Sequence, residues 1–284
     1  MIAVKDLKFT YPKNKVETLH GLNFEIGEGE IFGFLGPSGA GKSTTQKILF
    51  GLLKDFSGDV RVMNKGINQW GQELYTRIGI SFETPNHYES LTALENLEYF
   101  QTLYRETHDL QELLDWVGLA ADGDKRVSQF SKGMKVRLNV ARAMLHKPRI
   151  LFLDEPTMGL DPANARNIKD LVLRLRQQGT TVFITTHNMM VADELCDRVA
   201  FITGGELRII ETPATLKRQY GKRNVNVHYL DGEERVASFP LAGLGKNRAF
   251  LDLLNSGKRI EALHSQEATL ESIFIEVTGQ ELQV

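Results

Sequence analysis

The sequence has little of several features that would place it in other classes of protein. Cys196 is the only cysteine among 284 residues, so the chain cannot form an internal disulfide, and we expect a reducing compartment. No run of about 18 apolar residues occurs, so we expect no segment that spans a bilayer by itself. Residues 1–12 lack the basic and then apolar pattern of a secretory signal. The net charge of −2 provides no surplus of positive charge for nucleic acid or for an anionic membrane surface.

The order of apolar segments predicts an α/β fold. Short apolar runs at 31–35, 150–154 and 180–186 read as strands, and helical patterns separate them. Strands that alternate with helices in this way are typical of a mixed, largely parallel sheet that is covered on both faces. The stretch 92–147 is rich in helical patterns and predicts a helical insertion.

The pattern changes after Tyr220. Asp231-Gly232 lies between two strand-like segments, which is a strong signal for a hairpin, and helical patterns follow it. This part reads as a small α+β unit. We therefore expect a first domain at 1–220, with a helical subdomain at about 84–147, and a second domain at 221–284.

Residues 36–44, GPSGAGKST, fit the pattern of a phosphate-binding loop. An apolar strand precedes them and a helix follows, as this motif requires. Backbone N–H groups of such a loop and the helix N-terminus bind phosphate oxygens, Lys42 reaches the β and γ phosphates, and Ser43 ligates Mg²⁺. An ordinary glycine-rich turn is the alternative. The candidate nucleotide-binding residues are Gly36, Pro37, Ser38, Gly39, Ala40, Gly41, Lys42, Ser43 and Thr44.

Residues 150–156, ILFLDEP, supply a pair of carboxylates at the end of an apolar strand. Ligands of parallel sheets sit at the carboxyl ends of the strands. We expect Asp154 to hold Mg²⁺, directly or through water, and Glu155 to polarise a water for attack on the γ-phosphate. The alternative is an acidic pair that caps a following helix, since Pro156 ends the strand.

Two other classes of phosphate enzyme fit the sequence less well. A GTPase needs a guanine-reading Asn-Lys-x-Asp, and the segment at 64–67 lacks the aspartate. A small-molecule kinase carries a lid rich in arginine, whereas residues 83–130 form a helical insertion that FSKGM follows.

An ordered series of motifs resembles the ATP-binding subunits of ABC transporters. The motifs extend from residue 11 to residue 187, over roughly two thirds of the chain, which is far more specific than a phosphate loop alone. In chain order they are FTYP with Tyr11, GPSGAGKST, SFETP around Glu83, FSKGM at 130–134, ILFLDEP, GLDP at 159–162, and TTH ending at His187.

The resemblance implies a P-loop NTPase fold with an added antiparallel β subdomain. It also implies an ATPase with ATP and Mg²⁺ as cofactors, which powers membrane transport through ATP-driven dimer closure. The expected partners are a membrane-spanning permease and a second ATPase subunit, identical or related, and no nucleic acid. The expected location is peripheral, on the cytoplasmic face of the cell membrane. The segment 268–279 resembles the tails of ATPases that serve small exporters of the ABC-2 type.

The resemblance also implies a role for single residues. Glu155, His187 and Lys42 would be catalytic, with His187 contacting the γ-phosphate, and Tyr11 would stack on adenine. Ser131 and Gly133 would cap the γ-phosphate bound by the second subunit, and Asp161 would line the dimer interface. Both Ser131 and Asp161 also suit a plain N-cap of the helix that follows each of them.

Two positions depart from the family pattern. Glu83 stands where the family has Gln, in a loop that links Mg²⁺ to the transporter interface, and we count it among the nucleotide and metal residues. FSKGM replaces the commoner Leu-Ser-Gly-Gly-Gln, so Lys132 and Met134 are unusual. The resemblance also implies that the membrane partner docks at the helical region after Glu83, which includes residues 86–98. Aromatic and apolar residues in and beside this region are Phe82, His87, Tyr88 and Leu91, and the alternative is that they form the core of the helical subdomain.

Two other functions share these residues and stay open on the sequence alone. One is a soluble ABC ATPase without a transport role, for example in cofactor assembly. The other is a regulatory module that binds ATP without hydrolysing it, although Glu155 and His187 argue against that function. A DNA-acting ABC protein would need a long coiled-coil insertion, and the sequence has none.

Overall fold

The computed structural model describes residues 1–12, 15–220, 224–266 and 268–280. These residues form two compact units, Met1–Thr212 and Pro213–Gln280. The division between the units lies at Thr212, before helix α7, whereas the sequence places the change after Tyr220. Helix α7 (Pro213–Tyr220) packs on helix α9 (Leu270–Thr278) within the second unit. Among the residues described, no helix is long and apolar enough to cross a membrane.

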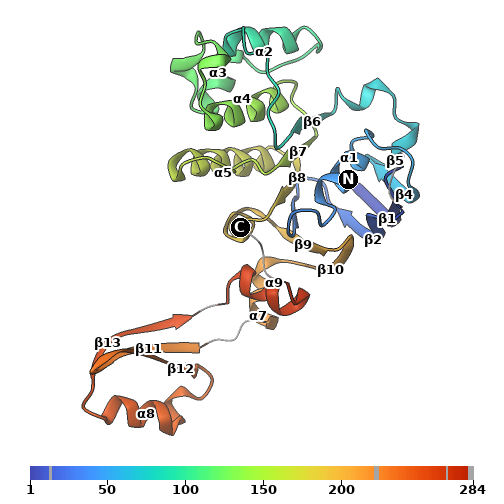
Figure 1. Cartoon of the computed structure of the whole chain (residues 1–284). Helices are drawn as coiled ribbons and strands as arrows, with labels where there is room; N and C mark the ends of the chain where they lie inside the picture. Colours follow the sequence, from blue (N-terminus) through green and yellow to red (C-terminus); the bar gives the residue numbers. More distant parts are fainter. Residues whose placement is uncertain (13–14, 221–223, 267, 281–284) are drawn as a thin grey trace. The chain divides into compact units, whose positions relative to one another are not determined.

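A six-stranded sheet forms the centre of the first unit (Figure 1). Its edge strand β10 is antiparallel to β9, and the other neighbouring pairs are parallel. This is the mixed, largely parallel sheet that the sequence predicts. Across the sheet the strands are β10 (Glu206–Glu211), β9 (Arg198–Thr203), β3 (Ile31–Leu35), β8 (Thr181–Thr186), β7 (Ile150–Asp154) and β6 (Ile78–Ser81).

The three central strands are buried along their whole length. Every residue of β3, β7 and β8 is buried, which explains why their sequences are continuous apolar or β-branched runs rather than alternating ones. Helix α4 (Lys132–Met144) contacts β6 and β7, and α5 (Pro162–Gln177) and α6 (Met189–Leu195) contact β8. Because the strands are parallel, their carboxyl ends meet at one edge, and the polar residues that follow them gather there.

A separate four-stranded antiparallel sheet belongs to the same unit. Its strands, in order, are β2 (Leu19–Ile26), β1 (Ile2–Phe9), β4 (Ser57–Val62) and β5 (Lys65–Gly66). Apolar residues of both sheets share one core, in which Phe24 of β2 stacks on Phe32 of β3 with 5.8 Å between ring centroids. Helix α1 (Lys42–Leu49) contributes to this core through Ile48 and Leu49.

The helical subdomain contains α2 (Ala93–Gln101), α3 (Leu110–Trp116) and α4, which lie together in green in Figure 1. Each helix begins at a side chain that accepts a backbone hydrogen bond. Thr92 and Glu95 form a reciprocal capping box at α2, and Asp109 and Ser131 cap α3 and α4. These caps place the helix starts where the sequence shows breaks between the helical patterns.

The second unit contains a three-stranded antiparallel sheet, in the order β12 (Glu233–Pro240), β11 (Asn224–Asp231) and β13 (Arg259–Gln266). Helix α8 (Arg248–Asn255) covers one face, and its Phe250 packs with Val225 and Val227. The hairpin predicted at Asp231-Gly232 is present, with Gly232 in a left-handed conformation between the strands. This is the α+β unit that the sequence predicts.

Some elements were not predicted as such. Strands β2 and β4 and helices α6 and α7 have no assignment in the sequence analysis, although an antiparallel subdomain was expected. β2 and β4 alternate buried with exposed residues only in part, because irregular pairing with β1 interrupts their register. Helix α6 is short and begins at Asn188, whose side chain accepts hydrogen bonds from Met190 and Val191.

Candidate functional site

A pocket of about 380 Å³ lies at the carboxyl edge of the six-stranded sheet. The phosphate loop and the start of α1 form one side of it, and residues at and after the ends of β6, β7 and β8 form the other side. The predicted residues that line the pocket are Ser38, Gly39, Gly41, Lys42, Ser43, Thr44, Glu83, Asp154, Glu155 and His187. Segments far apart in the sequence therefore meet at one site.

The loop between β3 and α1 has positions that only glycine can occupy. Gly41 has φ of 106°, and a Cβ built on it lies 2.6 Å from Cδ2 of Leu19. A Cβ at Gly36 would lie 2.1 Å from the carbonyl oxygen of Ile202 in the neighbouring strand. The left-handed conformation and the close backbone approach both exclude a side chain. The glycines are thus required for the tight turn that directs the loop's backbone toward the pocket.

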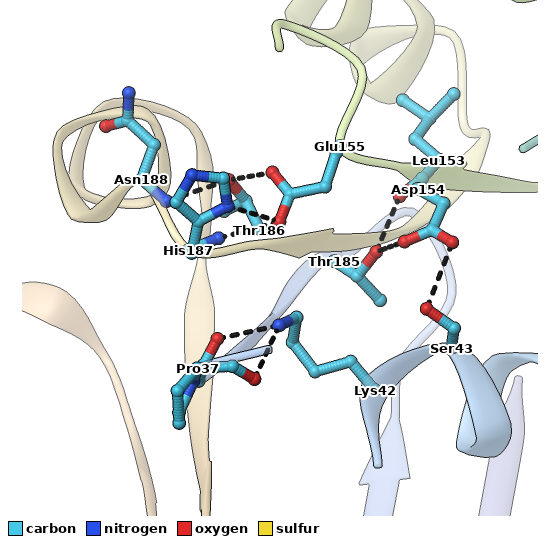
Figure 2. A network of polar contacts seen from close by, with 11 residues as sticks. Pro37, Lys42, Ser43, Leu153, Asp154, Glu155, Thr185, Thr186, His187 and Asn188 are labelled. Atoms are coloured by element: carbon cyan, nitrogen blue, oxygen red, sulfur yellow. Dashed lines mark hydrogen bonds and ion pairs between the residues drawn. The ribbon is translucent and has the colours of Figure 1, made fainter. Parts of the chain in front are cut away.

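Lys42 is bound by the loop that precedes it (Figure 2). Its Nζ donates hydrogen bonds to the carbonyl oxygens of Gly36, at 2.7 Å, and Pro37, at 3.0 Å. Burial lowers the pKa of Lys42 from its ordinary value, and the negative charges of Glu155, Asp154 and Glu83 oppose that shift. The nearby acidic groups thus favour the charged form of a largely buried ammonium group at the bottom of the pocket.

Ser43 and Asp154 bring oxygen atoms together across the pocket. Ser43 Oγ donates to Asp154 Oδ2 at 3.2 Å, and the hydroxyl of Thr185 donates to Asp154 Oδ1 (Figure 2). A serine hydroxyl beside a carboxylate fits Mg²⁺, which prefers oxygen ligands and takes few from the protein when a nucleotide supplies the rest. Among the residues described, no group of three or more His, Cys, Asp or Glu side chains is arranged to hold a metal ion.

Glu155 is held in place by several hydrogen bonds. Its backbone adopts a left-handed conformation with φ of 48°, and its N–H donates to the carbonyl oxygen of Thr185 at 3.0 Å. Its Oε2 accepts from the hydroxyl of Thr186 at 2.9 Å, and its Oε1 accepts from the backbone N–H of His187 at 3.0 Å. A non-glycine residue in this conformation costs about 1 to 3 kcal/mol, and such strain is common at functional sites.

His187 pairs with Glu155 through its ring. Nδ1 of His187 lies 2.7 Å from Oε1 of Glu155. Because carboxylate oxygens accept hydrogen bonds, Nδ1 is the donor in this contact, and Nε2 is the ring nitrogen that remains for contact with a ligand. The Glu155 side chain is 8% exposed and that of His187 is 38% exposed. The pair therefore joins a buried carboxylate to a ring that is open to a ligand.

Tyr11 follows strand β1 and contacts helix α1, which begins at the end of the phosphate loop. Its hydroxyl lies 3.0 Å from Oγ1 of Thr44, and its ring packs edge-to-face against Phe9 at 4.8 Å between centroids. Tyr11 is partly exposed and does not line the pocket. It lies next to the pocket rather than inside it.

Ser131, Gly133 and Asp161 do not line the pocket that contains Lys42. Ser131 is exposed, and its Oγ caps α4 by accepting from the N–H of Met134 at 3.2 Å. Asp161 caps α5, and hydrogen bonds from the backbone and the side chain of Asn164 lower the pKa of Asp161. Within a single chain, Ser131 and Asp161 therefore act as N-caps of the helices that follow them.

Glu83 lines a second pocket as well as the first. This neighbouring pocket, of about 450 Å³, also includes Lys132 and Lys135 of α4. Two of the residues that depart from the family pattern, Glu83 and Lys132, therefore lie in the same depression with opposite charges.

Thr185 and Thr186 are the site residues that the sequence analysis did not identify. Both are buried, and their hydroxyls donate to Asp154 and Glu155 respectively. The sequence signal that could have identified them is a pair of threonines at the end of a strand whose other residues suit an apolar interior. Met158, which also lines the pocket, has no comparable signal.

Comparison with known proteins identifies relatives along the whole chain. A family model described as ABC transporter matches residues 19–158, and a model described as fluoroquinolone efflux ABC transporter C-terminal domain matches residues 223–267. A fluoroquinolones export ATP-binding protein of Mycobacterium tuberculosis is 49% identical, and the match covers 99% of this chain and 94% of the relative. The linearmycin resistance ATP-binding protein of Bacillus subtilis is 31% identical, and the match covers 100% of both chains.

A solved structure resembles most of this chain. It is a dimeric, post-hydrolysis structure of an ATP-binding cassette bound to ADP and Pi, with a TM-score of 0.69 and 31% identity. The match covers 75% of this chain and 98% of the other chain. The similarity in three dimensions thus agrees with the similarity in sequence.

Proposed function

Because this chain belongs to the ATP-binding proteins of the ABC transporter family, we propose that it is the ATP-hydrolysing subunit of an exporter whose cargo is a fluoroquinolone or a molecule of that class. ATP binding and ATP hydrolysis belong to the family. The observation that carries the proposal is the arrangement of Lys42, Ser43, Asp154, Glu155 and His187 around one pocket.

We assign Lys42 and the loop at 36–44 to the phosphates of ATP. The positive charge of Lys42 and the N-terminus of α1 both favour anionic groups. Within the described part of the chain, Nζ of Lys42 donates to the carbonyl oxygens of Gly36 and Pro37, and an anionic phosphate competes well with neutral carbonyls for an ammonium group. Tyr11, which is hydrogen-bonded to Thr44, is assigned to the adenine ring.

Ser43 and Asp154 would hold Mg²⁺, with Glu83 nearby as a residue that senses the metal. The ion would neutralise charge on the phosphates when it is bound. Thr185 orients Asp154 by donating to its second oxygen, so the oxygen shared with Ser43 stays directed at the pocket. Residues that hydrogen-bond to a metal ligand fix its orientation and affect the affinity of the site for the metal.

We assign the role of general base to Glu155. Three hydrogen bonds from Thr186 and His187 fix its carboxylate, which has about four acceptor positions in total. The remaining position can accept the proton of a water that attacks the γ-phosphate. His187 would then orient that water and contact the γ-phosphate through Nε2.

A second subunit would complete each site. Ser131 and Gly133 do not line the pocket with Lys42, yet they lie at the N-terminus of α4, where an anion is favoured. We propose that these residues cap the γ-phosphate held by the opposite subunit, and that Asp161 lies between the subunits. Binding of ATP then closes the dimer, and hydrolysis weakens the attraction that holds it closed.

The proposed partner in the membrane is a permease, since ATP-binding subunits of ABC transporters act with such proteins. This chain would bind it peripherally at the cytoplasmic face of the membrane. We place the docking surface at the segment after Glu83 together with the adjacent Phe82, where Phe82 and Tyr88 are 40% and 47% exposed. The cargo assignment is supported by the full-length relative and by the model that matches residues 223–267 in the second unit.

The decisive experiment is purification of the protein from membranes, identification of the bound chains and reconstitution of the complex in vesicles. We expect ATP-dependent movement of a fluoroquinolone in the wild type and none with Glu155→Gln. A complex that hydrolyses ATP without moving any fluoroquinolone would contradict the cargo assignment. Purification without any membrane protein would contradict the transport role.

A further inference from the structure

Asn139 lies in the interior of helix α4, and only 1% of its surface is exposed. Asparagine suits a helix interior less well than alanine does, because its amide competes for backbone hydrogen bonds. Burial of an amide also costs free energy unless hydrogen bonds replace those it made to water. A buried asparagine at this position therefore points to a role outside the helix itself.

The amide of Asn139 makes three hydrogen bonds, and the chemistry of its partners determines its orientation. Nδ2 donates to Oγ of Ser81 and to the carbonyl oxygen of Phe82, both at 2.9 Å. Oδ1 accepts from the guanidinium of Arg142 at 2.7 Å. Because a carbonyl oxygen only accepts and a guanidinium only donates, rotation of the amide by half a turn would lose both of these contacts. The side chain is thus held in one orientation.

Close packing of α4 on strand β6 brings this short side chain to the end of the strand. A Cβ built on Gly79 of β6 would lie 2.0 Å from the carbonyl oxygen of Ala143 in α4, so the approach requires glycine. Ser81 lies two residues after Gly79, on the same face of the strand, and Asn139 lies one turn before Ala143, on the same face of the helix. The close approach at Gly79 therefore places Asn139 opposite Ser81.

The carbonyl group of Phe82 belongs to the peptide bond that leads into Glu83. Within the ranges that the structure describes, Glu83 itself takes part in no hydrogen bond. It nevertheless lines the nucleotide pocket, where its negative charge favours the charged form of Lys42. The position of Glu83 thus depends on the peptide group before it, which Asn139 binds.

A second contact of α4 holds the chain after Glu83. Arg142 donates from Nη1 to the carbonyl oxygen of Asn86 at 2.5 Å and from Nη2 to Asn139. Residues 83–85 lie between the two carbonyl groups that α4 binds. Of the two helix side chains, only Asn139 binds the peptide group attached to Glu83, so Asn139 has the more direct influence on the place of this residue.

We propose that Asn139 is a positioning residue for Glu83, which holds the peptide bond before Glu83 so that the carboxylate is directed at the Mg²⁺ that accompanies ATP. The proposal rests on the proposed function, which assigns Glu83 to the metal. Asn139 does not line the nucleotide pocket, so it acts through Glu83 and not on the ion. Side chains that orient a metal ligand without contacting the metal commonly change its affinity.

The variant Asn139→Asp isolates the contact with Phe82. Aspartate has the size of asparagine, accepts from Arg142 and can accept from the Ser81 hydroxyl, but as a carboxylate it has no donor for the Phe82 carbonyl oxygen. Metal binding is measured directly, by titration of Mn²⁺ into the full-length Glu155→Gln protein with equimolar ATP and detection of free Mn²⁺ by electron paramagnetic resonance. We expect the Mn²⁺ dissociation constant to rise several-fold. An added negative charge by itself attracts a cation, so charge alone would give the opposite result.

Ser81→Ala is the matched control. It removes a buried hydroxyl and one acceptor of Asn139 Nδ2, while the donor for the Phe82 carbonyl oxygen remains, so we expect Mn²⁺ binding as in the wild type. A double-mutant cycle with Glu83→Gln gives a readout that a purely structural role would not change. If Asn139 acts through Glu83, Asn139→Asp has no further effect on Mn²⁺ binding in the Glu83→Gln protein. Asn139→Ala, which buries no charge, should give the same cycle in a second variant.

The outcomes separate the proposal from the function on which it rests. Normal Mn²⁺ binding in both Asn139 variants, with weakened binding in Glu83→Gln, would overturn the proposal and leave the metal role of Glu83 in place. An Asn139 effect of equal size with and without the Glu83 carboxylate would also overturn it. Normal Mn²⁺ binding in Glu83→Gln would refute the metal role of Glu83 and the proposal with it, and absence of ATP-dependent Mn²⁺ binding in the wild type would refute the proposed function.

Discussion

The ring of His187 and the carboxylate of Glu155 form a hydrogen bond of 2.7 Å between Nδ1 and Oε1. The backbone N–H of His187 donates to the same oxygen, so one residue binds the carboxylate twice. This contact joins the end of β7 to the end of β8. It positions an acidic group and an imidazole together at the mouth of the pocket that contains Lys42.

Replacement of Glu155 by Gln should abolish turnover while ATP binding persists. An amide keeps hydrogen bonds to His187 and Thr186 but cannot accept a proton, and a general base contributes about 10²- to 10⁴-fold. Single-turnover hydrolysis and ATP-dependent dimer formation are the measurements. Glu28→Gln, at an exposed residue paired with Arg149, is the control and should hydrolyse normally. Rapid hydrolysis by Glu155→Gln would exclude Glu155 as the base.

Thr186→Val should lower turnover by roughly tenfold. It should also lower the free energy of unfolding by about 1 to 3 kcal/mol, because the Thr186 hydroxyl is buried and takes part in two hydrogen bonds. It donates to Glu155 and accepts from the N–H of Asn188 at 3.0 Å. Thr181→Val, at the other end of β8, removes a buried hydroxyl bonded to Gly29 and serves as the control. It should lose comparable stability and keep its turnover. Equal loss of turnover in both variants would show that Thr186 matters for folding only.

Ser131→Asp separates the two roles of this residue. Aspartate caps a helix as well as serine does, so the free energy of unfolding should change by less than about 0.5 kcal/mol. Its negative charge would repel a γ-phosphate presented by another subunit, so ATP-dependent dimerisation should be lost. Thr92→Asp changes the N-cap of α2 and should leave dimerisation intact. Light scattering with ATP in a Glu155→Gln background measures dimerisation of both variants. Normal dimerisation of Ser131→Asp would leave only the capping role for Ser131.

Glu83→Gln should raise the Mg²⁺ concentration needed for half-maximal hydrolysis several-fold. The carboxylate of Glu83 lines the same pocket as Asp154, and loss of one negative charge weakens the local attraction for a cation. Glu89→Gln, on the surface where Glu89 pairs with Lys135, is the control and should not move the Mg²⁺ curve. An unchanged dependence on Mg²⁺ and ATP in Glu83→Gln would argue against a metal-sensing role.

His87 should make the first unit less stable in acid. Burial, together with the charges of Arg142 and Lys135, lowers the pKa of His87 to about 4, against an ordinary value of 6.5. Between these values the unfolded chain binds a proton that the folded chain does not, so stability decreases as the pH falls from about 6.5 to 4.

His87→Gln keeps a donor for the carbonyl oxygen of Lys135, which accepts from Nε2 of His87 at 2.9 Å, and does not titrate. We expect the loss of stability between pH 7 and pH 5 to be smaller in this variant, by at most about 2 kcal/mol once solvent screening is allowed for. Urea denaturation at the two pH values measures it. An identical loss in the wild type and the variant would assign the acid sensitivity to other groups.

Each local part of the candidate site is a short motif, so the sequence alone could indicate which residues to expect there. Lys42 and Ser43 follow a strand and begin a helix, so their neighbours in the chain determine where they point. Asp154 and Glu155 end an apolar strand, and that position alone places them at the edge of a parallel sheet. The contacts of Thr185 and Thr186 escaped prediction because they join β8 to β7, which are separated in sequence by α5.

A groove of about 460 Å³ beside β6, α2 and α4 shows the same limit more clearly. The sequence indicated an aromatic segment near Phe82, His87 and Tyr88, and these residues do line the groove, whereas Leu91 is not among the residues that line it. The position of Arg142 in this groove could not be predicted, because a residue ten positions into α4 gains its surroundings only when that helix packs against β6.

By itself the sequence determined the class of fold, the phosphate loop and the order of the family motifs, because glycine conformation, strand burial and helix capping act over a few neighbouring residues. Only the tertiary structure decided which side chains from distant strands hold Glu155 and Asp154, and which aromatic residues line the groove beside α4. Those properties depend on distances across the sheet and between helices. They arise when the packed core brings residues far apart in the chain within hydrogen-bonding reach.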